Sequence, residues 1–168
     1  MVRIREITWE EYLEDVKKLA LIIKESNFKP DVIVAVARGG FVPARVISDI
    51  IGVDLILTIV AKAYKGIGRK SKVVIIQSFD CKHIIGKDVL VVDDIVDSGE
   101  TMVKVLEFIY KCSPREVRSA TVYHKPWSKI VPDYYIKTVK DWIVFPYEKE
   151  ETIRLLAKEA STLSRARK

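Results

Sequence analysis

The sequence predicts an α/β fold in which a mostly parallel sheet is flanked by helices on both faces. Apolar runs such as residues 32–37 and 89–92 contain no polar alternation, which is typical of strands that are covered on both sides. Segments with helical periodicity alternate with these runs along the chain, as they do in parallel sheets. In such sheets, ligands bind at the carboxyl ends of the strands.

The elements follow from local signals taken in chain order. Thr8 and Glu11 form a capping-box pattern that opens a helix with one apolar face. Pro43 suits a first helical turn, and Gly52 a helix stop. The predicted helices are 8–27, 42–51, one ending near residue 110, and 150–163. The predicted strands are 32–37, 55–60, 73–76, a run ending at 93–94, 117–124, and two short edge strands at 134–139 and 142–145.

Composition limits the class of protein. A chain of 168 residues is long enough for one domain with a sizeable core, and we expect a single domain over 1–168. Many Ile, Val, Lys and Glu residues favour a heat-adapted protein. The net charge of +6 suits either nucleic acid or phosphorylated substrates. No signal peptide or stretch of transmembrane length is present, so no membrane partner is expected.

The spacing of the two cysteines matches no metal or redox motif. Cys81 and Cys112 are far apart in sequence, and the chain has no Cys-x-x-Cys and only two histidines. We therefore expect neither a zinc site nor a disulfide, and a reducing cytoplasm is the natural compartment.

The most informative segment is the strand that ends in two carboxylates. Asp93 and Asp94 close the apolar run, and a helix-opening turn follows. A helix N-terminus offers unpaired N–H groups and about half a positive charge, so it can cradle an anion. Like charges exclude the two acids from a phosphate site, so they should face hydroxyls or a cation. A ribose 5-phosphate satisfies both requirements, because its phosphate suits the helix N-terminus and its hydroxyls suit the two acids. The residues of this segment are Asp93, Asp94, Ile95, Val96, Asp97, Ser98, Gly99, Glu100 and Thr101.

Two other nucleotide folds fit less well. A strand ending in Asp-Asp is also found in Walker B motifs, but the chain has no Gly-x-x-x-x-Gly-Lys-Ser/Thr. It has no Gly-x-Gly-x-x-Gly either, which disfavours a dinucleotide fold.

The segment from Val89 to Met102 resembles the phosphoribosyl diphosphate motif of the type I phosphoribosyltransferases. The resemblance implies that Asp93 and Asp94 bind the ribose 2- and 3-hydroxyls, and that the following turn wraps the 5-phosphate. Arg38, Gly39 and Gly40 resemble the family's pyrophosphate loop, in which a cis peptide bond often precedes the Arg.

The basic segment 62–72 resembles the family's mobile closing loop. Tyr64 and Arg69 match the family residues there, whereas Ala63 replaces the usual Ser. A solvated hairpin is the alternative for this charge run.

Three further positions resemble the 6-oxopurine enzymes of the family. Asp97 matches the carboxylate that exchanges a proton with purine N7. Lys125 matches the lysine that donates to O6 of the base. Trp142 and Ile143 match the pair that stacks on the purine and reads its pyrimidine edge by backbone groups.

The resemblance implies a purine salvage transferase. It would convert guanine, xanthine or hypoxanthine and phosphoribosyl diphosphate to the nucleoside 5-monophosphate and pyrophosphate, with Mg²⁺ held mainly by substrate oxygens, by Asp94 and then by Asp93. Parts of 1–12 and 124–150 would form a small base-binding hood, and the chain would form a homo-oligomer, a dimer or tetramer.

Two other functions fit the sequence less well. A phosphoribosyl diphosphate sensor that binds nucleic acid would use the basic charge, but it would not need Asp97, Lys125 and Trp142 together. An enzyme for 6-aminopurines conflicts with Lys125 as an O6 donor.

Overall fold

The computed structural model describes residues 3–64, 72–155 and 157. These residues form two compact units, one of 15–139 and one of 1–14 with 140–168. Helix α1 (Trp9–Glu25) runs from the smaller unit into the larger one.

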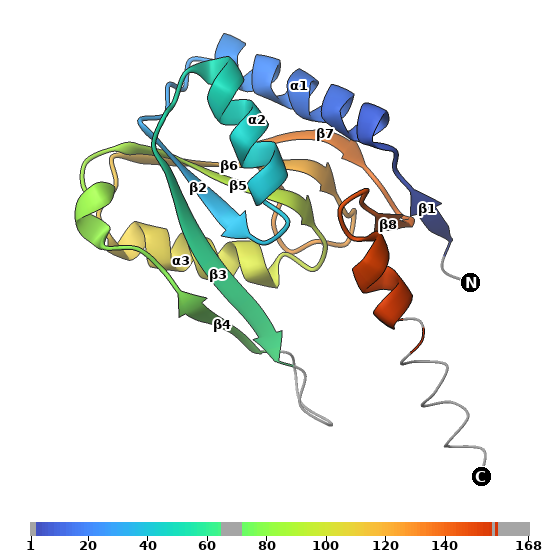
Figure 1. Cartoon of the computed structure of the whole chain (residues 1–168). Coiled ribbons are helices and arrows are strands. Elements are labelled where there is room, and N and C mark those ends of the chain that lie inside the picture. The colour runs from blue at the N-terminus through green and yellow to red at the C-terminus, as the bar shows by residue number, and fades with distance from the viewer. Residues whose placement is uncertain (1–2, 65–71, 156, 158–168) are drawn as a thin grey trace. The chain divides into compact units, whose positions relative to one another are not determined.

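The larger unit is built on a six-stranded sheet in the order β4-β3-β2-β5-β6-β7 (Figure 1). All neighbours pair in parallel except β3 and β4, so the predicted sheet is confirmed as mostly parallel. The strands are β2 (Val32–Ala37), β3 (Ile56–Tyr64), β4 (Lys72–Gln77), β5 (Asp88–Val96), β6 (Glu116–His124) and β7 (Tyr134–Thr138).

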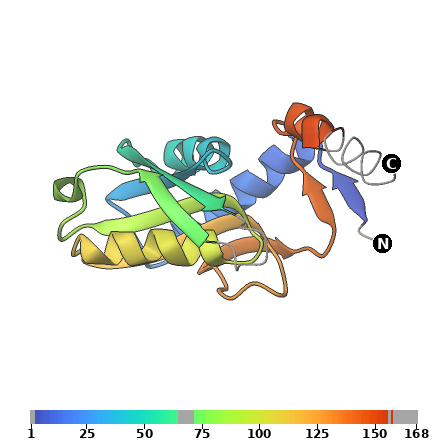
Figure 2. The same ribbon diagram turned by 90° about the horizontal axis from the view of Figure 1, so that it is seen from below.

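Helices cover both faces of this sheet. Helix α2 (Phe41–Ile51) packs on β2, β3 and β5, whereas α3 (Glu100–Lys111) packs on β3, β4 and β5. Figure 2 shows α2 and α3 on opposite sides of the strands. The side chains of Val34, Val91 and Val105 lie in the core between the sheet and α3 and are fully buried. Residues buried on two faces explain why these strands have unbroken apolar sequences.

The helix boundaries follow the predicted signals closely. The hydroxyl Oγ1 of Thr8 accepts a hydrogen bond from Glu11 N at 3.1 Å, and α1 begins at Trp9. Helix α2 ends at Gly52, whose φ of 74° is left-handed. Residues 149–155 are helical, as predicted, and the rest of the expected helix to 163 lies largely outside the described residues.

The smaller unit contains a two-stranded parallel sheet of β1 (Ile4–Glu6) and β8 (Trp142–Val144). Strand β1 was not predicted, and the prediction that 142–145 forms an edge strand of the main sheet was wrong, because β8 pairs with β1. Tyr12, Phe145 and Tyr147 form an aromatic cluster in this unit, with ring centroids 5.4–5.5 Å apart. Pairing between segments about 140 residues apart leaves no local sequence signal.

The expectation about the cysteines was wrong, because Cys81 and Cys112 form a disulfide. Cys81 begins the short 3-10 helix η1 (Cys81–His83), and Cys112 caps the end of α3. The chain segments beyond them are joined by backbone hydrogen bonds from Gly86 N to Ser113 O and from Arg115 N to Lys87 O, both 2.9 Å. The sheet therefore brings together two cysteines that lie 31 residues apart in sequence.

Candidate active site

Three of the predicted groups of site residues lie at one edge of the larger unit's sheet. Arg38 follows β2, Asp97 follows β5, and Lys125 follows β6. The three strands are parallel neighbours, with Val92 of β5 paired to Ala35 of β2 and to Ala120 of β6. Their carboxyl ends therefore meet, as the sequence analysis expected.

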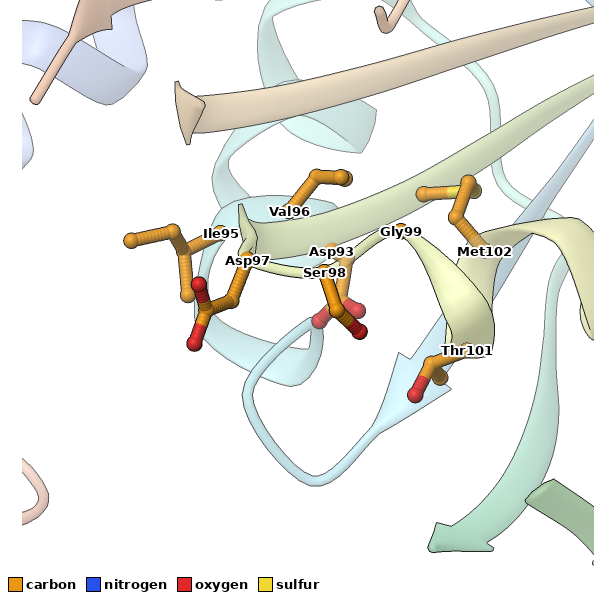
Figure 3. Close-up of a pocket in the computed structure, with 8 residues that line it drawn as sticks. All are labelled: Asp93, Ile95, Val96, Asp97, Ser98, Gly99, Thr101 and Met102. Atoms are coloured by element: carbon orange, nitrogen blue, oxygen red, sulfur yellow. The ribbon is translucent and has the colours of Figure 1, made fainter. Parts of the chain in front are cut away.

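A cavity of about 110 Å³ lies at the turn between β5 and α3. Its lining residues are Asp93, Ile95, Val96, Asp97, Ser98, Gly99, Thr101 and Met102. In Figure 3 the oxygen-bearing side chains lie on one side of the turn, whereas Val96 and Met102 lie on the other. One wall of the cavity is therefore polar, and the opposite side joins the core.

The turn itself is shaped by Ser98, Gly99 and Glu100. Gly99 is the N-cap of α3 and has a φ of 82°, which side-chain-bearing residues rarely adopt. The hydroxyl of Ser98 accepts a hydrogen bond from Glu100 N at 3.3 Å. Glu100 pairs its carboxylate with Lys129 at 2.9 Å, so that side chain turns to the neighbouring loop. The positive end of α3 thus adjoins the cavity.

The two acids at the strand end have different surroundings. Asp93 is half-buried and lines the cavity, and its Oδ1 accepts a hydrogen bond from Asp94 N at 2.9 Å. Asp94 is only 6% exposed, and its Oδ1 accepts from Ile95 N at 2.7 Å. Consecutive strand residues point to opposite faces, which separates the two carboxylates.

Asp94 lies against the loop that follows β2. A Cβ placed on Gly39 would overlap the Asp94 carboxylate, lying 2.6 Å from Oδ1 and closer to Oδ2 and Cγ. A Cβ on Gly40 would lie 2.6 Å from Val36 O and 2.9 Å from Val36 N. The glycines therefore allow this loop to approach the strand ends closely. The peptide bond between Ala37 and Arg38 is cis, as the family resemblance implied.

Asp97 and Lys125 are the first residues after the neighbouring strands β5 and β6. Lys125 N donates to Val96 O at 2.9 Å, and Val96 pairs with His124 in the register of β5 and β6. Lys125 is 5% exposed, whereas Asp97 is exposed. An ammonium group and a carboxylate are therefore offered from adjacent positions at the sheet edge.

Trp127 joins this group, although the sequence analysis did not select it. Its indole Nε1 donates to Asp97 Oδ1 at 2.9 Å, and Lys125 Nζ lies 5.3 Å from the centre of its ring. The only sequence signal is a large aromatic residue in a polar loop directly after Lys-Pro.

Other predicted site residues cannot be joined to this edge. Trp142 is 51% exposed and Ile143 is 7% exposed, and both lie in β8 of the smaller unit. Tyr64 ends β3, but its side chain is outside the described residues, as is the whole of Arg69.

The parallel sheet, with carboxylates and a helix N-terminus at the carboxyl ends of its strands, defines the class of protein. A family model described as the phosphoribosyl transferase domain matches residues 8–150, and the chain belongs to that family. A xanthine-guanine phosphoribosyltransferase from Desulfotalea psychrophila is 34% identical over 146 residues, 86% of this chain and 86% of that protein.

Solved structures agree with the family. The purine phosphoribosyltransferase from Pyrococcus horikoshii is 38% identical, with a TM-score of 0.77, over 87% of this chain and 94% of that one. A hypoxanthine-guanine phosphoribosyltransferase from Bacillus anthracis is 32% identical, with a TM-score of 0.68, over 80% of each chain. The predicted family, fold and enzyme class are confirmed, and the regulator alternative is not favoured.

No helix among the described residues is both long and apolar enough to cross a membrane.

Proposed function

We propose that this phosphoribosyltransferase converts a 6-oxopurine and phosphoribosyl diphosphate to the nucleoside 5-monophosphate and pyrophosphate. The observation that carries the proposal is the placement of Asp97 and Lys125 side by side, next to the turn at the start of α3. The relatives named above as xanthine-guanine and hypoxanthine-guanine enzymes support a 6-oxopurine as the base.

Phosphoribosyl diphosphate would span the sheet edge between β2 and β5. The 5-phosphate would lie in the turn formed by Asp97, Ser98, Gly99, Glu100 and Thr101, where the helix terminus favours an anion. The pyrophosphate would lie at the loop of Arg38, Gly39 and Gly40, where a guanidinium group can bind it in a fork. Ile95 and Val96 would contribute backbone groups.

The carboxylates fit magnesium, which prefers oxygen ligands and keeps several waters beside one or two carboxylates. Asp94 and then Asp93 would contact the ion and the ribose hydroxyls. Bound magnesium supplies charge neutralisation for the departing pyrophosphate. The hydrogen bond that Asp94 Oδ1 accepts from Ile95 N would orient the carboxylate for this proposed role.

The reaction breaks the bond from ribose C1 to the pyrophosphate oxygen and forms the bond from purine N9 to C1. Asp97 would accept the proton from purine N7, which leaves the nucleotide product neutral at that ring position. Lys125 would donate to O6, because an ammonium group has three donors and no acceptor. Positive groups around the leaving pyrophosphate would stabilise the charge that develops there.

The remaining predicted residues complete the proposal. Trp142 would stack on the purine and Ile143 would read it through backbone groups, with the smaller unit acting as the hood. Tyr64 and Arg69 would close over the pyrophosphate.

We further propose a homo-oligomer, a dimer or tetramer, in the cytoplasm. Phe41, Leu21 and Ile22 are each 45–48% exposed in the larger unit, which offers apolar surface for a second copy. A disulfide is compatible with the cytoplasm in heat-adapted organisms, whose intracellular proteins can be rich in disulfides. The composition of the chain favours such an origin.

The test is to supply labelled phosphoribosyl diphosphate, magnesium and one base at a time: guanine, xanthine, hypoxanthine or adenine. Wild type should form nucleotide with at least one oxopurine and reject adenine. Lys125→Met should lower kcat/KM for that oxopurine by about 10- to 100-fold, because a buried base oxygen loses its donor.

Lys104→Met is the matched control, because Lys104 lies on α3 and pairs only with Glu107 among the contacts described. It should leave kcat/KM unchanged. Equal use of adenine by wild type would overturn the 6-oxopurine assignment, and no nucleotide from any purine would overturn the proposed function.

A further inference from the structure

Trp127 is an exposed aromatic residue that contacts both groups assigned to the base. It is 56% exposed, yet its ring nitrogen and its ring face are both engaged. Nε1 donates to Asp97 Oδ1 at 2.9 Å, and the face lies 5.3 Å from Lys125 Nζ. A tryptophan held in this way does more than cover surface, since each of its two contacts is directional.

Hydrogen bonds join the loop that carries Trp127 to the turn between β5 and α3. Lys125 N donates to Val96 O at 2.9 Å, and Lys129 N donates to Ser98 O at 3.1 Å. The side chain of Lys129 also reaches Glu100 Oε1 at 2.9 Å. Residues 125–129 therefore run beside residues 96–100. Hydrogen bonds on both sides of Trp127, at Lys125 and Lys129, fix the position of its backbone.

The loop is also closed on itself. Ser128 N donates to Lys125 O at 3.1 Å, and Ser128 Oγ donates to Ile130 O at 2.8 Å. Gly99 allows the two segments to touch, because a Cβ there would lie 2.7 Å from Ser128 Oγ. The indole thus approaches Asp97 from a rigid base rather than from a free loop.

The chemistry of the contact suits a proton acceptor. Asp97 is exposed, and an exposed aspartate can otherwise change its side-chain torsions freely. The indole N–H is a donor only and cannot take the proton itself. By occupying Oδ1, it fixes the plane of the carboxylate and leaves Oδ2, which accepts no hydrogen bond from the residues that the structure describes, for the base.

We propose that Trp127 is a positioning residue that orients the Asp97 carboxylate toward the purine, an inference that rests on the proposed function. The cation–π contact places Lys125 against the same ring. One side chain therefore sets the spacing between the group that accepts from N7 and the group that donates to O6.

The test is Trp127→Phe, which removes the N–H donor and keeps an aromatic face for Lys125. The expected result is a fall in kcat of about tenfold, because a hydrogen bond to a charged group is lost. KM for phosphoribosyl diphosphate should stay within about twofold, since the 5-phosphate turn and the pyrophosphate loop are untouched. Tyr110→Phe is the matched control, because Tyr110 is 60% exposed and lies at the far end of α3.

A second variant distinguishes loss of the N–H donor from loss of the ring's packing. Replacement of Trp127 by benzothienylalanine keeps the bicyclic ring and removes only the N–H, so the same fall in kcat is expected with an unchanged melting temperature. A normal kcat in this variant would overturn the proposal.

A double-mutant cycle with Asp97→Ala separates positioning from a structural effect. If Trp127 acts through Asp97, Trp127→Phe should change kcat by less than about twofold in the Asp97→Ala background. An undiminished tenfold effect in that background would overturn the inference. A wild-type enzyme without activity on any purine would instead refute the proposed function.

Discussion

Replacing Gly39 by Ala should damage the site while leaving the sheet intact. A Cβ on Gly39 would overlap the Asp94 carboxylate, whose Oδ1 would be 2.6 Å away. Atoms at that separation cannot both stay in place. Because Asp94 is 6% exposed and its side chain is short, the relief is a displacement of its carboxylate or of the loop after β2.

The size of the effect follows from the cost of overpacking. Inserting a methyl group into a closed site costs roughly 1–3 kcal/mol. If this cost falls on the conformation that binds phosphoribosyl diphosphate and magnesium, the Kd rises by about 5- to 150-fold. The melting temperature should fall little, because the carboxylate can move and the strand ladder need not.

Isothermal titration of wild type and Gly39→Ala with phosphoribosyl diphosphate and magnesium measures this difference. Gly40→Ala gives the contrast, since its Cβ would press on backbone atoms of Val36 and so should lower the melting temperature. Gly52→Ala controls for glycine replacement as such: it meets no atom within 4 Å, and its left-handed φ should reduce stability without changing Kd. An unchanged Kd for Gly39→Ala would refute the placement of Asp94 in the binding site.

Three other predictions concern stability. Replacing Asp93 and Asp94 together by Asn removes two negative charges, one of them buried, and keeps an oxygen acceptor at each position, so the melting temperature should hold or rise while binding of phosphoribosyl diphosphate weakens; ready unfolding would make the pair structural. Loss of the disulfide through Cys81→Ser with Cys112→Ser should cost about 3.7 kcal/mol by the entropy of a loop that spans 31 residues. This loss should lower Tm by about 7–15 °C, and an unchanged calorimetric Tm would contradict this. Burial lowers the pKa of His124, so the unfolded chain binds its proton more readily and stability should fall as the pH drops below about 6.5. Melting curves from pH 7.5 to 5.5 should show a smaller fall in His124→Phe, and an equal fall would exclude His124 as the cause.

Local signals were sufficient for most of the larger unit. The strand over 32–37 was predicted with the bounds of β2, because an apolar run ends sharply at Arg38 and two glycines. The turn between β5 and α3 was also predictable, since consecutive residues from Asp97 to Thr101 carry the signal of a helix start after a buried strand. In both cases, neighbours in sequence supply the whole signal.

The features that were missed depend on pairing between distant segments. Strand β1 has three exposed residues, and only its register with β8, where Ile4 pairs with Trp142, makes it a strand. The disulfide depends on η1 meeting the end of α3. Neither the pairing of β1 with β8 nor the approach of η1 to α3 leaves a pattern in the adjacent sequence.

Trp127 is another feature that was not predicted. Its contact with Asp97 shows how the register of the sheet determines the positions of the side chains at the site. Asp97 and Trp127 are 30 residues apart, and they meet because the register of β5 and β6 pairs Val96 with His124. A slip of one residue would turn each side chain to the other face of the strand. The apolar packing that fixes this register is therefore also what sets the 2.9 Å contact at Asp97, so buried core residues such as Val91 and Val122 govern the geometry of the carboxylate that we propose as the proton acceptor.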